Sequence, residues 1–203
     1  MSIPLDEMQE LRRPKISGRR PTAEVAIGIG AFAAAAISIL VVPSIEGVLG
    51  GGLALIMAAI AVIDRRHFII PNELTAASFV LGLVNAALRT PEAVMREMVD
   101  GSLRAMALAG ALLAVRAFYR GLRHREGIGL GDVKLAGVAG AWLDWNMMPL
   151  SIDVAALAAL SVYGARSALR GRPLRPTSRL PFGQFLAPAI WLCWLLETAL
   201  FGL

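Results

Sequence analysis

Gly129-Leu130-Gly131-Asp132-Val133-Lys134-Leu135 is the most informative stretch of this 203-residue chain. It places a carboxylate, Asp132, directly behind two glycines and at the start of an apolar run over 130–148. An ionisable side chain at the mouth of a segment apolar enough to enter a membrane is costly there, which makes it a candidate for function. An earlier apolar run ends on a second such carboxylate, Asp64. These two aspartates are therefore the first candidates for a site.

The rest of the chain is too apolar for a soluble domain of this length. Hydrophobic residues make up 57% of the positions and charged residues only 17%, and the mean hydropathy is +0.64. These values are typical of a polytopic membrane protein. The net charge of +5 does not indicate nucleic-acid binding, because the charges lie in short clusters between apolar runs. Loop charges that orient a membrane protein have this distribution.

Seven apolar runs predict an all-α membrane bundle of about six to seven transmembrane helices. A run of about 20 residues is long enough for a helix to cross a bilayer. The run over 101–118 carries Arg104 and Arg116, which we expect to snorkel from its ends. Residues 1–22 are predicted to be a basic cytoplasmic segment and 23–203 a single transmembrane domain. The apolar runs lie at 23–42, 48–63, 74–89, 101–118, 130–148, 152–168 and 182–202.

The basic residues predict the orientation of the bundle. With a cytoplasmic N-terminus, only Arg89, Arg96 and Arg104 among the 20 lysines and arginines lie near outward connections. Such an asymmetry is the positive-inside pattern. Asp64, at the end of the second run, and Asp132, at the start of the fifth, then both face the cytoplasm. We therefore expect an inner-membrane protein with its site on the cytoplasmic side.

Each aspartate also has a purely structural interpretation. Asp64 is followed by two arginines and can pair with them in solvent, although a carboxylate at the carboxyl end of a helix opposes the helix dipole. Asp132 suits the start of a helix, where Asp is a good cap. Capping, however, requires neither Gly129 nor Gly131. Together these glycines allow an irregular backbone and the close approach of another chain segment.

The polar residues nearby have ordinary interpretations. Pro71 enforces a turn, and Asn72 is well placed to N-cap the helix that follows. Lys134 is either an interfacial anchor or a group that tunes a nearby carboxylate. Glu73 and Glu126 are rival carboxylates on the same face, which we interpret as solvated or paired with arginines.

No metal ion or cofactor is expected. His67 and His124 are isolated and lack the His spacing of a zinc site. The single cysteine, Cys193, lies in an apolar stretch without a partner, which excludes a Cys-based zinc site and an internal disulfide. We interpret Cys193 as a buried packing residue.

Three motifs occur in order along roughly residues 45–200. The first joins Asp64 to Ile70-Pro71-Asn72, the second is the Gly-x-Gly-Asp-x-Lys block within 126–135, and the third begins Pro181-Phe182-Gly183. Together they resemble the signatures of the type IV prepilin peptidases, which are intramembrane aspartic proteases of the Gly-x-Gly-Asp type. The resemblance implies that Asp64 and Asp132 form the catalytic pair and that no metal is used. It assigns supporting roles to Pro71, Asn72, Gly129, Gly131, Lys134, Pro181, Phe182 and Gly183.

The resemblance also implies a substrate. The partner would be a pilin-like precursor, cleaved after a short basic leader at the cytoplasmic membrane face, with membrane lipid and components of a pilus or secretion assembly nearby. Larger members of the family carry an insert with paired Cys-x-x-Cys motifs and an N-methyltransferase activity. This chain has neither, and it is similar to the short members that serve tight-adherence pili, so no methylation is predicted. The third motif departs from the pattern at Gln184, where proline is frequent.

A two-carboxylate hydrolase needs one ionised and one protonated carboxyl group. From their helix ends, Asp132 is predicted to favour the anion and Asp64 the acid. Two other classes use the same features: a proton-coupled transporter and a non-catalytic scaffold of pilus or secretion assembly. A transporter favours ionisable groups near the midplane and related halves, whereas both aspartates lie at one edge and no internal repeat is present. A scaffold leaves the two aspartates and their glycines without a role.

Overall fold

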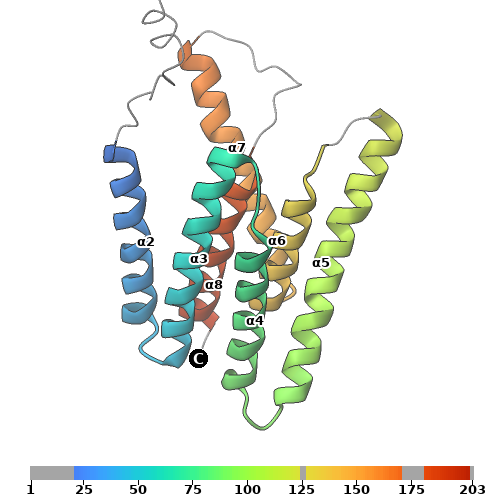
Figure 1. The fold of residues 1–203 in the computed structure, drawn as a ribbon. Coiled ribbons are helices and arrows are strands. Elements are labelled where there is room, and N and C mark those ends of the chain that lie inside the picture. Colours follow the sequence, from blue (N-terminus) through green and yellow to red (C-terminus); the bar gives the residue numbers. More distant parts are fainter. Residues whose placement is uncertain (1–20, 124–126, 171–180, 202–203) are drawn as a thin grey trace, which may run out of the picture.

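The structure, a computed structural model, describes residues 21–123, 127–170 and 181–201, and every regular element in them is an α-helix (Figure 1). The predicted all-α bundle is confirmed. Residues 1–20 of the basic segment predicted over 1–22 lie outside the described residues, as do two residues discussed above, His124 and Glu126. The helices are α2 (Pro21–Val41), α3 (Ile45–His67), α4 (Asn72–Arg89), α5 (Val94–Arg123), α6 (Leu130–Trp142), α7 (Met147–Arg170) and α8 (Gly183–Phe201).

Four of the described helices are long and apolar enough to span a membrane. They are α3, α5, α7 and α8, and a shorter apolar stretch lies at Val25–Val41 in α2. The predicted crossing at 130–148 is wrong in length, because α6 stops at Trp142 after 13 residues. At 1.5 Å per residue α6 is about 20 Å long, which is short of the roughly 30 Å hydrocarbon core. The helix that carries Asp132 therefore begins and ends within the bundle.

Small residues let the inner helices come close, as their frequency in the sequence predicts. Most of α6 is buried, and it packs against α4, α5, α7 and α8. A Cβ atom added to Gly140 of α6 would lie 2.5 Å from the backbone nitrogen of Ala105 in α5. A Cβ atom on Gly82 of α4 would lie 2.8 Å from the ring of Trp142. Side chains at these glycines would push α4 and α5 away from α6.

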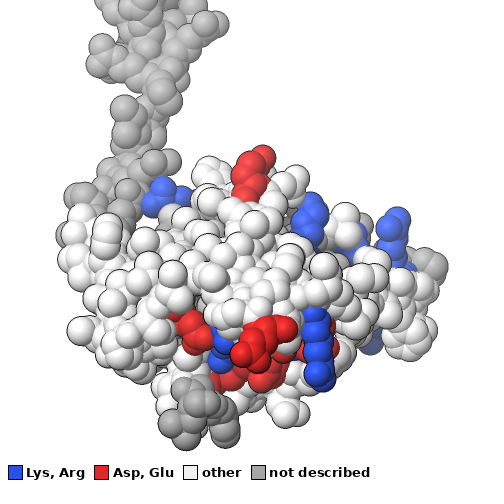
Figure 2. Space-filling view, turned by 90° about the horizontal axis from the view of Figure 1, so that it is seen from below, with Lys and Arg blue, Asp and Glu red and all other residues white. Residues whose placement is uncertain are grey.

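The two ends of the bundle differ in charge. In Figure 1 the carboxyl end of α3 and the amino ends of α6 and α8 lie toward the upper end, and the α3–α4 connection runs down from there to the amino end of α4. At the opposite end the α2–α3, α4–α5 and α6–α7 connections meet, and acidic side chains gather there (Figure 2). Arg89 of this lower end pairs with Glu46, and Arg104 pairs with Asp100. Arg96, in the first turn of α5, also lies near the lower end. The remaining described lysines and arginines lie on segments near the upper end: Arg65, Arg66, Arg116, Arg120, Arg123, Lys134, Arg166 and Arg170.

Candidate active site

Asp64 lies in the last turn of α3 and is buried, with 5% of its surface exposed. α3 ends at His67, and the next residue, Phe68, has a φ of 55°, a left-handed conformation that non-glycine residues rarely adopt. Oδ2 of Asp64 accepts a hydrogen bond of 2.8 Å from the backbone N–H of Gln184, in the first turn of α8. The amino end of a helix carries partial positive charge. The buried carboxylate is thus stabilised by the start of a helix 120 positions away.

Asp132 is the third residue of α6, not its N-cap. The N-cap is Gly129, whose extended backbone precedes the helix. The N–H of Gly129 donates to Oδ2 of Asp132 at 3.3 Å, so the carboxylate satisfies one of the free amides at the helix start. Asp132 keeps part of its surface exposed. The structural interpretation of Asp132 as a helix-start residue therefore holds, and it leaves the second carboxylate oxygen available.

Ile70 occupies the space between the second and third motifs. It is buried, whereas Phe68 and Ile69 before it are exposed. An added Cβ on Gly131 would lie 3.0 Å from Cβ of Ile70, and one on Gly183 would lie 2.7 Å from its Cδ1. Both glycines are therefore needed for this side chain to enter. The close approach predicted for Gly131 is the approach of the α3–α4 connection.

The N-cap predicted for α4 is wrong by one residue. Pro71 occupies the cap position and Asn72 is the first helical residue, without a side-chain cap bond. The carbonyl of Pro71 instead accepts the N–H and the hydroxyl of Thr75, at 3.1 and 2.7 Å. Oδ1 of Asn72 accepts a 2.6 Å hydrogen bond from Nζ of Lys134. Lys134 therefore ties the start of α6 to the start of α4.

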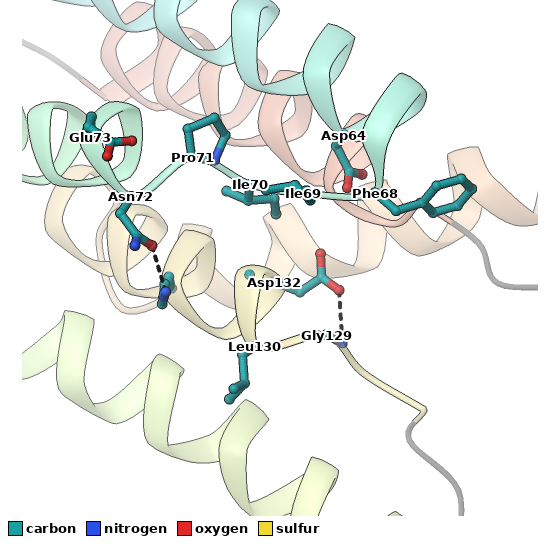
Figure 3. A pocket seen from close by; sticks show the side chains of 12 residues that line it. Asp64, Phe68, Ile69, Ile70, Pro71, Asn72, Glu73, Gly129, Leu130 and Asp132 are labelled. Carbon is teal, nitrogen blue, oxygen red and sulfur yellow. Dashed lines mark hydrogen bonds between the residues drawn. The ribbon is translucent and has the colours of Figure 1, made fainter.

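The two aspartates line one cavity of about 570 Å³ at the upper end of the bundle. Figure 3 shows their carboxylates turned toward one another across it. Burial of Asp132 raises its pKa to about 6, the nearby charge of Asp64 adds to this rise, and the Gly129 hydrogen bond opposes it. Neither aspartate forms an ion pair with a described lysine or arginine. The lining residues are Asp64, Phe68, Ile69, Ile70, Pro71, Asn72, Glu73, Gly129, Leu130, Gly131, Asp132 and Lys134.

The third motif lies just behind this cavity. Pro181 is buried and Phe182 is partly buried, and the carbonyl of Phe182 accepts the N–H groups of Phe185 and Leu186 at the start of α8. Gly183 is adjacent to Asp64, and a Cβ there would lie 2.9 Å from Oδ2 of that aspartate. The motif residues therefore do not line the cavity themselves. They place the amino end of α8 against Asp64. Within the described residues, no three His, Cys, Asp or Glu side chains gather in a way that could hold a metal ion.

Arg116 is a site residue that the sequence interpretation missed. It was expected to snorkel, but it is buried on α5 and donates a hydrogen bond to the carbonyl of Ile128, directly before Gly129. Arg104 is also buried, and its Nε donates to the carbonyl of Gly140 at 3.2 Å. The available signal was an arginine in a long apolar run, because a buried guanidinium needs partners.

Residues 51–164 match the model of the "Type IV leader peptidase family", and this range includes both aspartates. A "Prepilin leader peptidase/N-methyltransferase" of Burkholderia pseudomallei (strain K96243) is 36% identical over 176 residues, which are 86% of this chain and 54% of that relative. The "Leader peptidase HopD" of Escherichia coli is 33% identical over 132 residues, 62% of this chain and 78% of that protein. The chain thus spans about half the length of the Burkholderia relative. No solved structure matches the chain.

Proposed function

This chain belongs to the type IV leader peptidase family and is a multi-pass inner-membrane protein, and from that premise we propose that it is an endopeptidase that removes the leader of prepilin-type precursors. Asp64 and Asp132 are its catalytic pair. The observation that carries the proposal is the convergence of these two carboxylates, from α3 and α6, on one water-accessible cavity. Paired carboxylates without a compensating cation can share one proton between them.

We propose that Asp64 is the usual base and Asp132 the usual acid, the reverse of the assignment from the sequence. That assignment considered only the helix to which each residue belongs. Burial opposes the anion at Asp64 as well, but the N–H of Gln184 and the amino end of α8 favour it there. At Asp132 burial and the charge of Asp64 favour the protonated form. The proton nevertheless belongs to the pair as a unit.

The chemical step follows from this arrangement. Asp64 takes a proton from water as the water oxygen attacks the scissile carbonyl carbon, and Asp132 gives its proton to the carbonyl oxygen. The tetrahedral intermediate then collapses: the C–N bond breaks, the leaving nitrogen receives the proton from Asp64, and Asp132 takes its proton back. The aspartate pair and the reacting groups together carry a single negative charge at every stage.

We further propose that the cavity opens to the cytoplasm. It lies at the end of the bundle that holds most of the described lysines and arginines, and positive charge marks the cytoplasmic side. Three acids line the cavity, Asp64, Asp132 and Glu73, against a single lysine, Lys134, which is engaged with Asn72. A cavity with this balance suits a basic leader.

We also propose that the enzyme cleaves without methylating. The Burkholderia relative carries both activities in its name and HopD only the first. The single cysteine of this chain, Cys193, is buried on α8 and cannot form a Cys-x-x-Cys pair. Mass spectrometry of the mature product formed with S-adenosylmethionine is expected to show a free amino terminus. A product heavier by one methyl group would contradict this part of the proposal.

The main test is cleavage of a prepilin-type precursor by membranes that contain the wild-type protein or the variants Asp64→Asn and Asp132→Asn. Each variant is expected to lose activity by about a thousandfold, because general acid–base catalysis contributes about 10²–10⁴. Glu73→Gln is the matched control: it neutralises a third acid of the same cavity, so it should raise KM for the basic leader and leave most of kcat. Retained cleavage in either aspartate variant, at equal protein level, would contradict the assignment of Asp64 and Asp132 as the catalytic pair. No cleavage by the wild type would contradict the proposed function.

A further inference from the structure

Two arginines of α5 donate hydrogen bonds to backbone carbonyls at the two ends of α6. Arg104 and Arg116 are both buried, and the 12 positions between them correspond to about 18 Å along a helix, close to the length of α6. Arg104 binds the carbonyl of Gly140 at the lower end, and Arg116 binds the carbonyl of Ile128 at the upper end. Although the two contacts are alike in chemistry, only the upper one touches the turn that leads into the cavity.

At the upper end one peptide group joins Arg116 to Asp132. The carbonyl of Ile128 accepts the hydrogen bond from Arg116, and the N–H of the same peptide group, that of Gly129, donates to Oδ2 of Asp132. In a trans peptide these two groups point in opposite directions. The guanidinium and the carboxylate therefore lie on opposite sides of one rigid plane. A rotation of that plane would break both hydrogen bonds.

We propose that Arg116 is a positioning residue for Asp132, acting through the Ile128–Gly129 peptide. This inference rests on the proposed function, because it concerns how the acid of that site is held. The cation polarises the peptide, which strengthens the donor that faces the carboxylate, since hydrogen bonds in a chain reinforce one another. It also holds the peptide plane, and so the direction in which the carboxylate faces the cavity.

A second contact from α5 supports the same turn. Tyr119 lies three residues after Arg116, and its ring packs against Gly127, where an added Cβ would lie 2.7 Å from ring carbon Cδ1. α5 therefore touches two of the three described residues between α5 and α6. The turn before Asp132 is shaped by the helix beside it rather than by its own glycines alone.

Other charged or titratable groups face the same region and must stay constant in a test. Asp64 of α3, Glu73 of α4 and Lys134 of α6 line the cavity with the acid concerned. On α7 the hydroxyl of Tyr163 accepts a hydrogen bond of 3.4 Å from the side chain of Gln184, and the guanidinium of Arg166 lies over its ring. A substitution at position 116 changes none of them. A shift in the titration of the acid can therefore be assigned to the loss of the arginine.

The experiment compares Arg116→Gln, Arg116→Lys and Arg104→Gln in full-length protein in lipid nanodiscs. Arg116→Gln is expected to lower kcat for precursor cleavage about tenfold or more, because it removes a hydrogen bond from a charged donor, and such bonds are stronger than those between neutral groups. KM should change by less than about twofold, since the residue does not touch the cavity. The descending limb of the pH profile of kcat/KM should move to higher pH by about half a unit to one unit. Arg116→Lys should recover part of both effects, because it keeps a cation at the carbonyl.

Arg104→Gln is the matched control, since it removes the equivalent contact at the lower end. It should lower thermal stability about as much as Arg116→Gln and leave the pH profile in place. Unchanged kcat in Arg116→Gln would overturn the proposal. So would a loss of activity that leaves the descending limb of the pH profile in place and that Arg104→Gln reproduces. Carboxyl ¹³C NMR titration of Asp132, assigned with Asp132→Asn, tests the same point without activity. A titration that Arg116→Gln leaves unmoved would overturn the positioning role even if no precursor is cleaved, while failure of cleavage alone counts only against the proposed function.

Discussion

Each end of the bundle contains a pair of neighbouring carboxylates that includes one fully buried acid, and the surroundings of the two pairs differ. At the upper end Asp64 and Asp132 face a cavity of about 570 Å³, and neither has an ion-pair partner among the described residues. At the lower end Glu197 of α8 is buried and accepts the N–H of Asp144 at 3.2 Å, and Asp144 lies 3.9 Å from the guanidinium of Arg104.

The comparison shows what separates a chemical pair of acids from a structural one. At the lower end a guanidinium and a backbone N–H engage the carboxylates in contacts that join helices, which suits a structural role. A pair that must exchange a proton with water needs access and no such cation. Burial alone does not distinguish the two pairs, because Asp64 and Glu197 are equally buried, each with 5% of its surface exposed. The predictions below test this distinction, beginning with the largest effect.

The strongest contrast is between neutralising the two pairs. Asp64→Asn and Asp132→Asn are expected to lower the cleavage rate about a thousandfold. Asp144→Asn and Glu197→Gln should lower it less than about threefold, because an amide oxygen in place of Glu197 still accepts the N–H of position 144. Initial rates at matched protein level in membranes provide the comparison. Equal losses at both ends would erase the difference between the pairs.

We expect the pH dependence of kcat/KM for cleavage to arise from the upper pair of carboxylates. Asp132 must hold its proton to polarise the scissile carbonyl, and its pKa is raised to about 6. As the pH rises through this value the proton is lost, so kcat/KM should fall about tenfold for each further pH unit. Rates measured between pH 5 and 8 should show this fall of kcat/KM in the wild type, and the same fall in Asp144→Asn. A flat or rising profile above pH 6 would mean that Asp132 is not the acid.

A single methyl group tests the packing around the upper pair. In Gly183→Ala the new carbon would lie 2.9 Å from Asp64 Oδ2 and 2.7 Å from Ile70 Cδ1. Overpacking of this kind typically costs about 1–3 kcal/mol, and we expect about a tenfold loss of kcat with expression retained. Gly110→Ala on α5 is the control, because no neighbouring atom lies within 4 Å of the added carbon. Full activity in Gly183→Ala would show that the third motif is not held tightly against Asp64.

The smallest effect concerns one backbone hydrogen. Gln184→Pro removes the N–H that donates to Asp64 at 2.8 Å, and proline is tolerated in the first turn of a helix. We expect about a fivefold lower rate, in keeping with the loss of one hydrogen bond to a charged group, partly replaced by water. Gln184→Ala keeps the N–H and should cleave like the wild type. If both variants behave alike, the start of α8 does not support the base.

Much of the fold can be predicted from the sequence. The apolar runs predict seven helices in the observed order, and the motif spacing indicates the family, because both depend on residues close together in the chain. Predictions failed where a distant segment supplied the partner. Asn72 bonds Lys134 of α6 rather than capping α4, and α6 ends at Trp142 rather than continuing to 148. A buried indole that donates to the carbonyl of Ser78 at 2.8 Å is a tertiary contact that local periodicity does not contain.

The amino-acid sequence alone determines which charged side chains enter the bundle, and it identifies the two aspartates. How those charges are held is a property of the packed chain. Gln184 supports Asp64 from 120 positions away, and Arg116 reaches Asp132 through a peptide group. The physical reason is that both contacts use backbone N–H and C=O groups, which every residue type except proline carries in full. No residue letter marks them, so only the packing of α5 and α8 against the cavity determines which of them act.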